Sequence, residues 1–251
     1  MTAIVKSPVA MAAMWRSDTA IKALQANATA WKTFTGATSA VMGKTVAILA
    51  NLDPSGYADM TAIASSQVAM AAIQKSQTAL NAIAASSMAT AKYAAGAAGL
   101  NPADYADMTA IAASQVAMAA VAASQVAMAA IAGSGKARVA ITNSSVALAA
   151  LASSPLKKSV STSAYNGNYA KLVTNGPCFI ISATHNNSGW PFGVRYVYTS
   201  ETASGAKTYS STGSAQSINL FTTSAGLEAF ANADSSSSGR VTFVYIPCKA
   251  A

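Results

Sequence analysis

Apolar and polar residues alternate with a ten-residue period through the first part of the chain. In residues 106–134, ADMTAIAASQVAMAAVAASQVAMAAIAGS, a bulky aliphatic residue recurs every ten positions, and a serine follows each one three positions later. An α-helix turns by about 100° per residue, so equivalent side chains ten residues apart lie about 80° apart around the axis. Neither a straight helix nor a heptad coiled coil keeps such positions on one face. The chain must therefore bend once per repeat.

The periodic Ser or Asn supplies the bend. Ser7-Pro8 and Ser17-Asp18 have the pattern of a helix start, a capping oxygen followed by proline or an acid in the first turn. Each decapeptide therefore predicts a capped helix of about two turns, which ends where the next cap begins. The predicted repeat helix caps are Ser7, Ser17, Asn27, Ser66, Ser76, Ser114, Ser124, Ser134 and Ser144.

Helices of two turns are unstable alone because nucleation outweighs a few hydrogen bonds, so each needs neighbours. Alanine at most intervening positions lets neighbours approach closely, either in the same chain or in symmetry mates. The pattern predicts a fibrous, oligomeric shaft of short stacked α-helices over residues 1–156.

A longer repeat of 48 residues overlies the short one. NLDPSGYADMTAIASSQVAMAAI from Asn51 recurs as GLNPADYADMTAIAASQVAMAAV from Gly99. Its Pro and Asp residues predict turns, with Asp59 and Asp107 each capping the next helical segment. The shaft is thus expected in blocks of about 1–50, 60–98 and 108–156.

The second part of the chain has a β pattern. Residues 157–169, rich in Ser, Gly and Asn, are expected to be a linker, and 170–251 an antiparallel β-sandwich tip domain. The predicted fold class is α+β multidomain, with the helical part at the N-terminus and the β part at the C-terminus. About six strands are expected, at 170–174, 178–183, 194–199, 206–210, 217–222 and 240–246.

The amino-acid composition limits the classes of partner that the chain is expected to bind. Apolar residues make up 52% of the chain and charged residues only 10%, so we expect burial between chains in a homo-oligomer. The net charge of +8 comes from dispersed Lys and Arg, which argues against nucleic-acid binding. No signal peptide is evident at the N-terminus, so synthesis in a cytoplasm is expected.

Little in the sequence favours catalysis, so we expect no enzyme, no catalytic residues, no cofactor and no metal. His185, the only histidine, is expected at the surface, and the acids Glu201, Glu228 and Asp234 are scattered through loop-like sequence. GSGK at 133–136 lacks the spacing of a phosphate-binding loop. Cys178 and Cys248 could form a disulfide or remain two buried thiols, and the sequence favours the thiols. Residues 108–135 carry no basic or acidic side chain, yet the repeat explains them better than membrane insertion.

Aromatic residues around NSGWPFGVRYVY offer a candidate contact surface. Trp190, Phe192 and Tyr198 on or beside a Gly/Pro turn could stack on a sugar. The alternative is that they are core aromatics beneath a loop.

The iterated S-Q-V-A-M-A-A-I decapeptides, followed by a β-rich end closing GRVTFVYIPCKAA, resemble the alanine-rich repeat regions of tail-fibre and related virion proteins of tailed bacteriophages. The sequence resemblance covers about residues 1–156. The remaining residues resemble these proteins only in being a β-rich end. It implies a structural protein without enzymatic activity, often a homotrimer, mounted on the virion after assembly in the host cytoplasm. Its partners would be other virion proteins of baseplate, collar or capsid and a host surface glycan or protein. A tail fibre, whisker or head appendage with a role in host attachment is therefore the expectation. A bacterial surface adhesin, or a carbohydrate-binding module on a repeat stalk, is the alternative.

Overall fold

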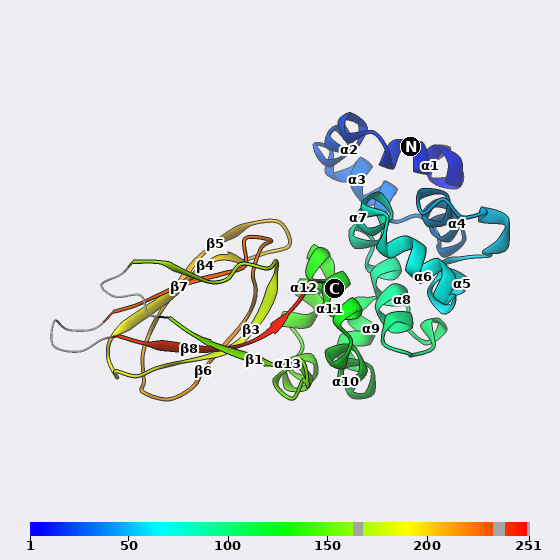
Figure 1. Ribbon diagram of the computed structural model, residues 1–251. Coiled ribbons are helices and arrows are strands. Elements are labelled where there is room, and N and C mark those ends of the chain that lie inside the picture. The colour runs from blue at the N-terminus through cyan, green and yellow to red at the C-terminus, as the bar shows by residue number, and fades with distance from the viewer. Residues whose placement is uncertain (163–167, 233–238, 250–251) are drawn as a thin grey trace. The chain divides into compact units, whose positions relative to one another are not determined.

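The computed structural model describes residues 1–162, 168–232 and 239–249 of the chain (Figure 1). The described residues form helices in the N-terminal part and two four-stranded antiparallel sheets in the C-terminal part, as the sequence predicts at this level. By its contacts the chain divides into two compact units, Met1–Ile111 and Ala112–Ala251. The helices are α1 (Pro8–Trp15), α2 (Asp18–Gln25), α3 (Ala28–Thr35), α4 (Ser39–Leu49), α5 (Met60–Ser65), α6 (Gln67–Gln74), α7 (Gln77–Ala85), α8 (Ser87–Ala97), α9 (Met108–Ala113), α10 (Gln115–Ala123), α11 (Gln125–Gly133), α12 (Gly135–Thr142) and α13 (Ser145–Ala152), with short 3-10 turns η1 (Ile4–Lys6), η2 (Pro54–Gly56) and η3 (Pro102–Asp104).

Each predicted cap residue directly precedes a helix, and its backbone is extended. The side-chain oxygen accepts a hydrogen bond from the backbone N–H three residues later, as between Ser114 and Ala117 at 3.2 Å. This satisfies one of the free N–H groups at the helix start. The bonds are made by Ser7, Ser17, Asn27, Ser66, Ser76, Ser114, Ser124, Ser134 and Ser144.

The ten positions of a repeat have distinct environments within a single chain. In the decapeptide that begins at Ser114, Ala117, Met118 and Val121 are fully buried, whereas Val116 is 74% exposed. The small alanine side chain leaves room for close backbone approach at the third position after the cap, and Met and Ile or Val fill the space between helices. Equivalent buried alanines are Ala69, Ala79, Ala89, Ala127, Ala137 and Ala147.

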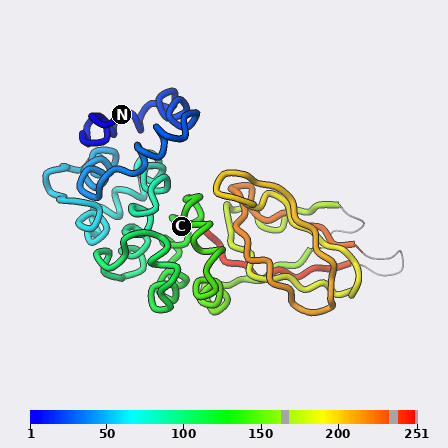
Figure 2. Tube along the Cα trace, turned by 180° about the vertical axis from the view of Figure 1, so that it is seen from behind, coloured from blue at the N-terminus to red at the C-terminus, as the bar shows by residue number. Residues whose placement is uncertain are grey.

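The chain bends between successive helices, and four pairs of helices three apart in sequence pack together. The axes of α10 and α11 differ by 102°. Such bends return the chain over itself after about three helices, which explains why α1 packs on α4, α4 on α7, α5 on α8 and α10 on α13. Figure 2 shows the resulting run of short coils, without a continuous rod in either compact unit. The ten-residue period is therefore the length of one short helix plus its cap.

Some serines at the cap position of the repeat also bond to another helix, and Ser154 does so although no helix follows it. Ser144 Oγ accepts from Ala147 N–H and donates to the carbonyl of Ala112, 32 residues earlier, at 2.5 Å. Ser154 Oγ donates in the same way to the carbonyl of Ala122. Because a hydroxyl both donates and accepts, serine can cap its own helix and close the free carbonyl end of another.

The 48-residue repeat marks two places where the pattern is interrupted. The longer helices α4 and α8 are each followed by a residue in the left-handed region, Asn51 at φ 57° and Gly99 at φ 73°. These are the residues that adopt this conformation most readily. A 3-10 turn comes after each, and then Asp59 or Asp107 caps the next helix.

The C-terminal strands form two antiparallel sheets with a shared core. The sheet orders are β1-β8-β3-β6 and β2-β7-β4-β5. One buried cluster holds side chains of both sheets, among them Ile180 and Phe243 of the first and Phe192, Val194 and Ala229 of the second. The strands are β1 (Lys158–Ser161), β2 (Ala170–Val173), β3 (Cys178–His185), β4 (Pro191–Tyr198), β5 (Ser204–Ser210), β6 (Gln216–Phe221), β7 (Leu227–Ala231) and β8 (Val241–Pro247).

Two of these strands are not expected from the sequence. The strand β1 falls within 157–169, the predicted linker, of which 163–167 lie outside the described residues. Its residues, KSVS, have no strong strand pattern and gain their order from pairing with β8. The strand β7, LEAFA, consists largely of good helix formers, yet all its residues are buried between β2 and β4.

Candidate functional site

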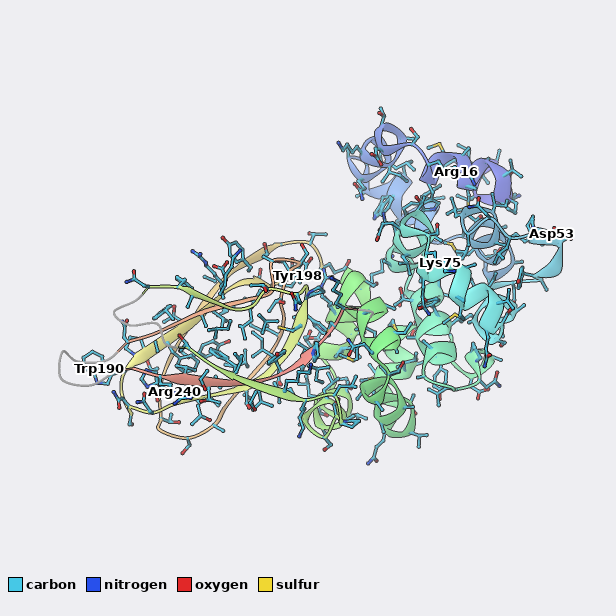
Figure 3. The ribbon with its side chains drawn as sticks, in the orientation of Figure 1. Arg16, Asp53, Lys75, Trp190, Tyr198 and Arg240 are labelled. Carbon is cyan, nitrogen blue, oxygen red and sulfur yellow. The ribbon has the colours of Figure 1, made fainter. Side chains whose placement is uncertain are left out.

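The structure separates the three aromatics that the sequence groups as a contact surface. Trp190, in the loop before β4, is 36% exposed, and Tyr198, at the end of β4, is half-buried. Figure 3 shows them at opposite ends of the β part. Phe192 is fully buried in the shared core and stacks on Tyr209 with 5.2 Å between ring centroids. Phe192 is thus unavailable to a ligand, because alternation along β4 turns it inward, and only Trp190 remains as an open aromatic of this set.

Tyr198 covers a buried arginine of the last repeats. The guanidinium carbon of Arg138 lies 3.4 Å from the Tyr198 ring centroid, a cation–π contact. Arg138 donates from Nη1 to the carbonyl of Ala132 and from Nη2 to that of Glu201, both at 2.6 Å. Burial lowers the pKa of this guanidinium from its ordinary value, with Tyr198 and Glu201 opposing the shift. These contacts brace α12 against the β4–β5 loop.

Gly135, in the GSGK stretch, is required by the packing of the β4–β5 loop against α12. A Cβ at this position would lie 2.6 Å from the carbonyl oxygen of Glu201, closer than real Cβ contacts. The glycine therefore admits the β4–β5 loop over the first turn of α12. A second brace is Gln125 of α11, whose Nε2 donates to the carbonyls of Pro247 and Lys249 at 2.6 and 2.8 Å.

A charged and aromatic cluster lies on the face of β2, β7 and β4 that is turned away from the shared core. Arg195 Nε donates to Glu228 Oε2 at 2.5 Å, and Arg195 Nη2 pairs with the same oxygen. Lys171 Nζ lies 3.7 Å from the other carboxylate oxygen. The hydrogen bond from Arg195 to Glu228 raises the pKa of the guanidinium. We call Tyr169, Lys171, Arg195, Tyr196 and Glu228 the Arg195 cluster.

Aromatic rings flank the guanidinium. The Arg195 guanidinium carbon lies 4.5 Å from the Tyr169 ring centroid and 5.0 Å from that of Tyr196. Tyr169 also packs edge-on against Phe230, with 5.0 Å between centroids. Gly193 gives Phe230 its place, since a Cβ there would collide with the ring. The guanidinium is therefore held in one orientation from three sides.

The sequence does not predict this cluster, and the reason can be identified. Its pattern places Glu228 among loop acids, but the residue lies in β7 and is 2% exposed. The inward neighbours Leu227 and Ala229 alternate with Glu228 and Phe230, and that period of two is the available signal. Of the other acids, Glu201 is exposed in the β4–β5 loop, and Asp234 lies outside the described residues.

His185 and the cysteines are buried. His185 is 1% exposed, so the expected surface position is wrong. Asn187 N–H donates to His185 Nδ1 at 2.8 Å. The ring proton is therefore on Nε2, which donates to the carbonyl of Asn232 at 2.9 Å. Cys178 and Cys248 are free thiols. Burial raises the pKa of Cys178 to about 12 and that of Cys248 well above its ordinary value.

Within residues 1–162, 168–232 and 239–249, no group of three or more His, Cys, Asp or Glu could hold a metal ion. No single helix of that part is long and apolar enough to cross a membrane; only α10 and α11 taken together pass by length and composition, and they are bent by 102°.

Neither a family model nor a curated protein matches the chain.

Proposed function

We propose that the chain is a structural fibre or appendage protein of a tailed bacteriophage particle, as the sequence resemblance implies. The observation that carries the proposal is the repeat itself. Capped helices of one kind pack on the next helix and, in four pairs, on the helix three further along, so decapeptides can be added with the same kinds of contact. A chain built in this way suits a support whose length is set by repeat number.

In the proposed assembly, residues 1–156 form the shaft of stacked helices, and 170–251 form a β-sandwich that contributes to host attachment. Support for the sandwich comes from the buried cluster that side chains of both sheets share. Attachment to baseplate, collar or capsid proteins would leave this β part free for a host surface glycan or protein.

We further propose that the chain assembles as a homo-oligomer, a trimer in keeping with the resemblance. The support is a set of exposed valines at one repeat position, Val9, Val68 and Val116, which are 69%, 70% and 74% exposed. Val68 borders a shallow groove of about 520 Å³ with Ala71, Ala72 and Lys75. A β-branched apolar residue gives no benefit to a solvated helix surface, whereas it would be stabilising if another chain covered it.

Immunogold electron microscopy tests the location. Antibodies against the full chain should label an appendage of phage particles purified from a lysate that expresses it. Labelling restricted to the surface of uninfected bacteria would refute the virion proposal and favour the adhesin alternative.

Sedimentation tests the assembly state. The full chain should sediment as a trimer, and Val68→Asp with Val116→Asp should dissociate it while the helical circular dichroism is kept. Val68→Thr with Val116→Thr, which keeps the shape without adding charge, is the matched control. A wild-type chain that sediments as a monomer at micromolar concentration would contradict the oligomer.

The second candidate, a carbohydrate-binding module on a repeat stalk, is favoured by the Arg195 cluster. Its flanking tyrosines and fixed guanidinium are groups that bind sugars. The two candidates differ in where the protein is mounted, which the immunogold experiment decides.

A further inference from the structure

The Arg195 cluster depends on an irregularity in β4. Side chains of Phe192 and Val194 point into the shared core, and simple alternation would turn residue 196 inward as well. The pairing of β4 with β5 instead shifts register between Arg195 and Val197, so Val197 takes the inward place. Arg195 and Tyr196, consecutive residues, thereby come together outside the core, with the guanidinium carbon 5.0 Å from the Tyr196 ring centroid.

Tyr196 occupies an unfavourable backbone conformation. Its φ is 60°, in the left-handed region, where a bulky side chain is rare. The other non-glycine residues described there, Asn51 and Asn219, are of a type that tolerates it. The carbonyl of Tyr196 accepts a hydrogen bond from Thr223 N–H at 2.7 Å, which holds the bulge in place.

Packing does not explain why tyrosine stands at this position. The Tyr196 side chain is 40% exposed, so the strain is not offset by full burial of the ring. Backbone strain that the surrounding structure maintains is concentrated at functional sites. An exposed aromatic ring held at a strained bulge therefore points to a ligand that uses the ring.

The charges of the cluster indicate the character of that ligand. Among the described residues, Glu228 is the carboxylate that pairs with both Arg195 and Lys171, so these three side chains carry one positive charge in excess. The carboxylate is buried beneath its partners, whereas the side chain of Arg195 is 40% exposed and that of Lys171 is 62% exposed. Glu228 engages Nε and Nη2, so the guanidinium keeps further N–H donors for an incoming anion.

Small side chains lie on the other flank of Arg195. Ala206 of β5 is its direct partner across the ladder, Thr208 lies two residues further along, and Ala206 is exposed. No bulky group at these β5 positions therefore covers the guanidinium on this side. A sugar ring could rest here against Tyr196 with its charged substituent toward Arg195.

We propose that the Arg195 cluster binds an acidic saccharide, whose apolar ring face stacks on Tyr196 and whose carboxylate pairs with Arg195 and Lys171. The assignment rests on the proposed function only in taking the host surface as the source of the sugar. A protein ligand is less well supported, since Trp190 and Tyr196 are the large exposed apolar side chains described in the β part, and a stable protein interface needs a larger apolar centre.

Calorimetry with a defined sugar tests the proposal on the full chain. Oligogalacturonate should bind, and its methyl ester, which keeps the sugar backbone and removes the charge, should bind about tenfold more weakly or not at all. Equal binding of acid and ester, or binding of neither, would overturn the inference.

Substitutions locate the site. Tyr196→Asn should weaken binding by about tenfold or more while the melting temperature is unchanged or raised, because asparagine tolerates the left-handed conformation. Arg195→Lys should also weaken binding, since an ammonium group cannot hold Glu228 and an incoming carboxylate through separate N–H groups of one planar fork. Trp190→Ala, which removes a similarly exposed aromatic, is the matched control and should bind as the wild type does. Full affinity in Tyr196→Asn, or loss in Trp190→Ala alone, would place any sugar elsewhere.

Cell binding separates a sugar ligand from a protein ligand and the site from the proposed function. Attachment of the full chain to bacteria should be lost after periodate oxidation of surface sugars and kept after protease treatment; the reverse result would overturn the inference. If virions carry the chain but the acidic sugar does not bind, the inference fails and the proposed function stands. If the sugar binds but virions are not labelled, the inference stands and the virion assignment fails.

Discussion

At the residue scale, the cap serines of the repeat differ in the roles of their hydroxyl groups. Ser144 accepts from Ala147 N–H and donates to the carbonyl of Ala112, which belongs to another helix. Ser17 accepts the cap bond from Ala20 N–H within its own helix. A hydroxyl is needed at the first position, whereas any good capping acceptor suffices at the second.

Aspartate at these two positions separates capping from bonding between helices. Ser144→Asp should cost about 1–3 kcal/mol, because a carboxylate cannot donate to the Ala112 carbonyl and would face it with like partial charge. Ser17→Asp should change stability by less than about 0.5 kcal/mol, since aspartate is an equally good cap. Thermal unfolding followed by circular dichroism measures both. Equal effects at the two positions would contradict the distinction.

The buried thiol of Cys178 makes stability depend on alkaline pH. Its pKa is raised to about 12 in the folded chain from an ordinary 9.0, so the folded state retains a proton that the unfolded state releases. The stabilisation is complete below pH 9 and is lost as the pH rises toward 12. The free energy of unfolding should therefore fall between about pH 8 and about pH 11 by about 3 kcal/mol more in the wild type than in Cys178→Ser.

Denaturant unfolding of residues 112–251 at several pH values measures this difference, because Trp190 is the only tryptophan in that segment. Parallel curves for wild type and Cys178→Ser would show that the thiol does not titrate as burial predicts.

At the element scale, α12 departs from the repeat where it meets the β4–β5 loop. Other decapeptides, such as those beginning at Ser114 and Ser124, carry glutamine at the first helical position, whereas α12 carries Gly135. The carbonyl of Glu201 occupies the space that a side chain would need. At α12 a tertiary contact therefore requires glycine where α6, α7, α10 and α11 begin with glutamine.

Restoring the consensus should therefore be harmful. Gly135→Gln is expected to destabilise residues 112–251 by about 1–3 kcal/mol, because the loop carrying Glu201 must move away from α12 and Arg138 loses an acceptor. Gly205→Ala is the control within the same segment, since a Cβ there would make only an ordinary contact of 3.7 Å with Thr199. Urea unfolding measures both. A Gly135→Gln chain as stable as the wild type would show that the loop moves without cost.

At the scale of the whole molecule, the compact unit that contains the β strands also contains the last repeats. The unit begins at Ala112, whereas the composition changes near residue 156. Arg138 and Gln125 make the contacts that join these repeats to the β4–β5 loop and to the end of β8.

A pair of fragments tests this division. Residues 112–251 should melt about 5–10 °C higher than residues 157–251, because the shorter fragment lacks the partners of Tyr198 and of the Pro247 carbonyl. Differential scanning calorimetry gives both values. Equal melting temperatures would mean that the repeats add nothing to the stability of the strands.

Much of the helical part could be predicted from sequence because its determinants are local. Serine followed at fixed distance by Ala, Met and Ile specifies where each helix begins and which face is buried, and a ten-residue step excludes a straight rod. The strands were predicted less well. β1 lacks a local signal, and the period of two in β7 is obscured by its helix-forming residues, so both strands depend on pairing with β8, β2 and β4.

The sequence by itself determined the capped helices, their length and the bend between them, since hydrogen bonds and side-chain spacing within about ten residues suffice for each. Only the tertiary structure decided that Phe192 is buried, that Tyr198 covers Arg138 and that Arg195, Tyr196 and Glu228 come together. These depend on a register shift in β4 and on pairing between residues as far apart as 195 and 228, which no local pattern encodes.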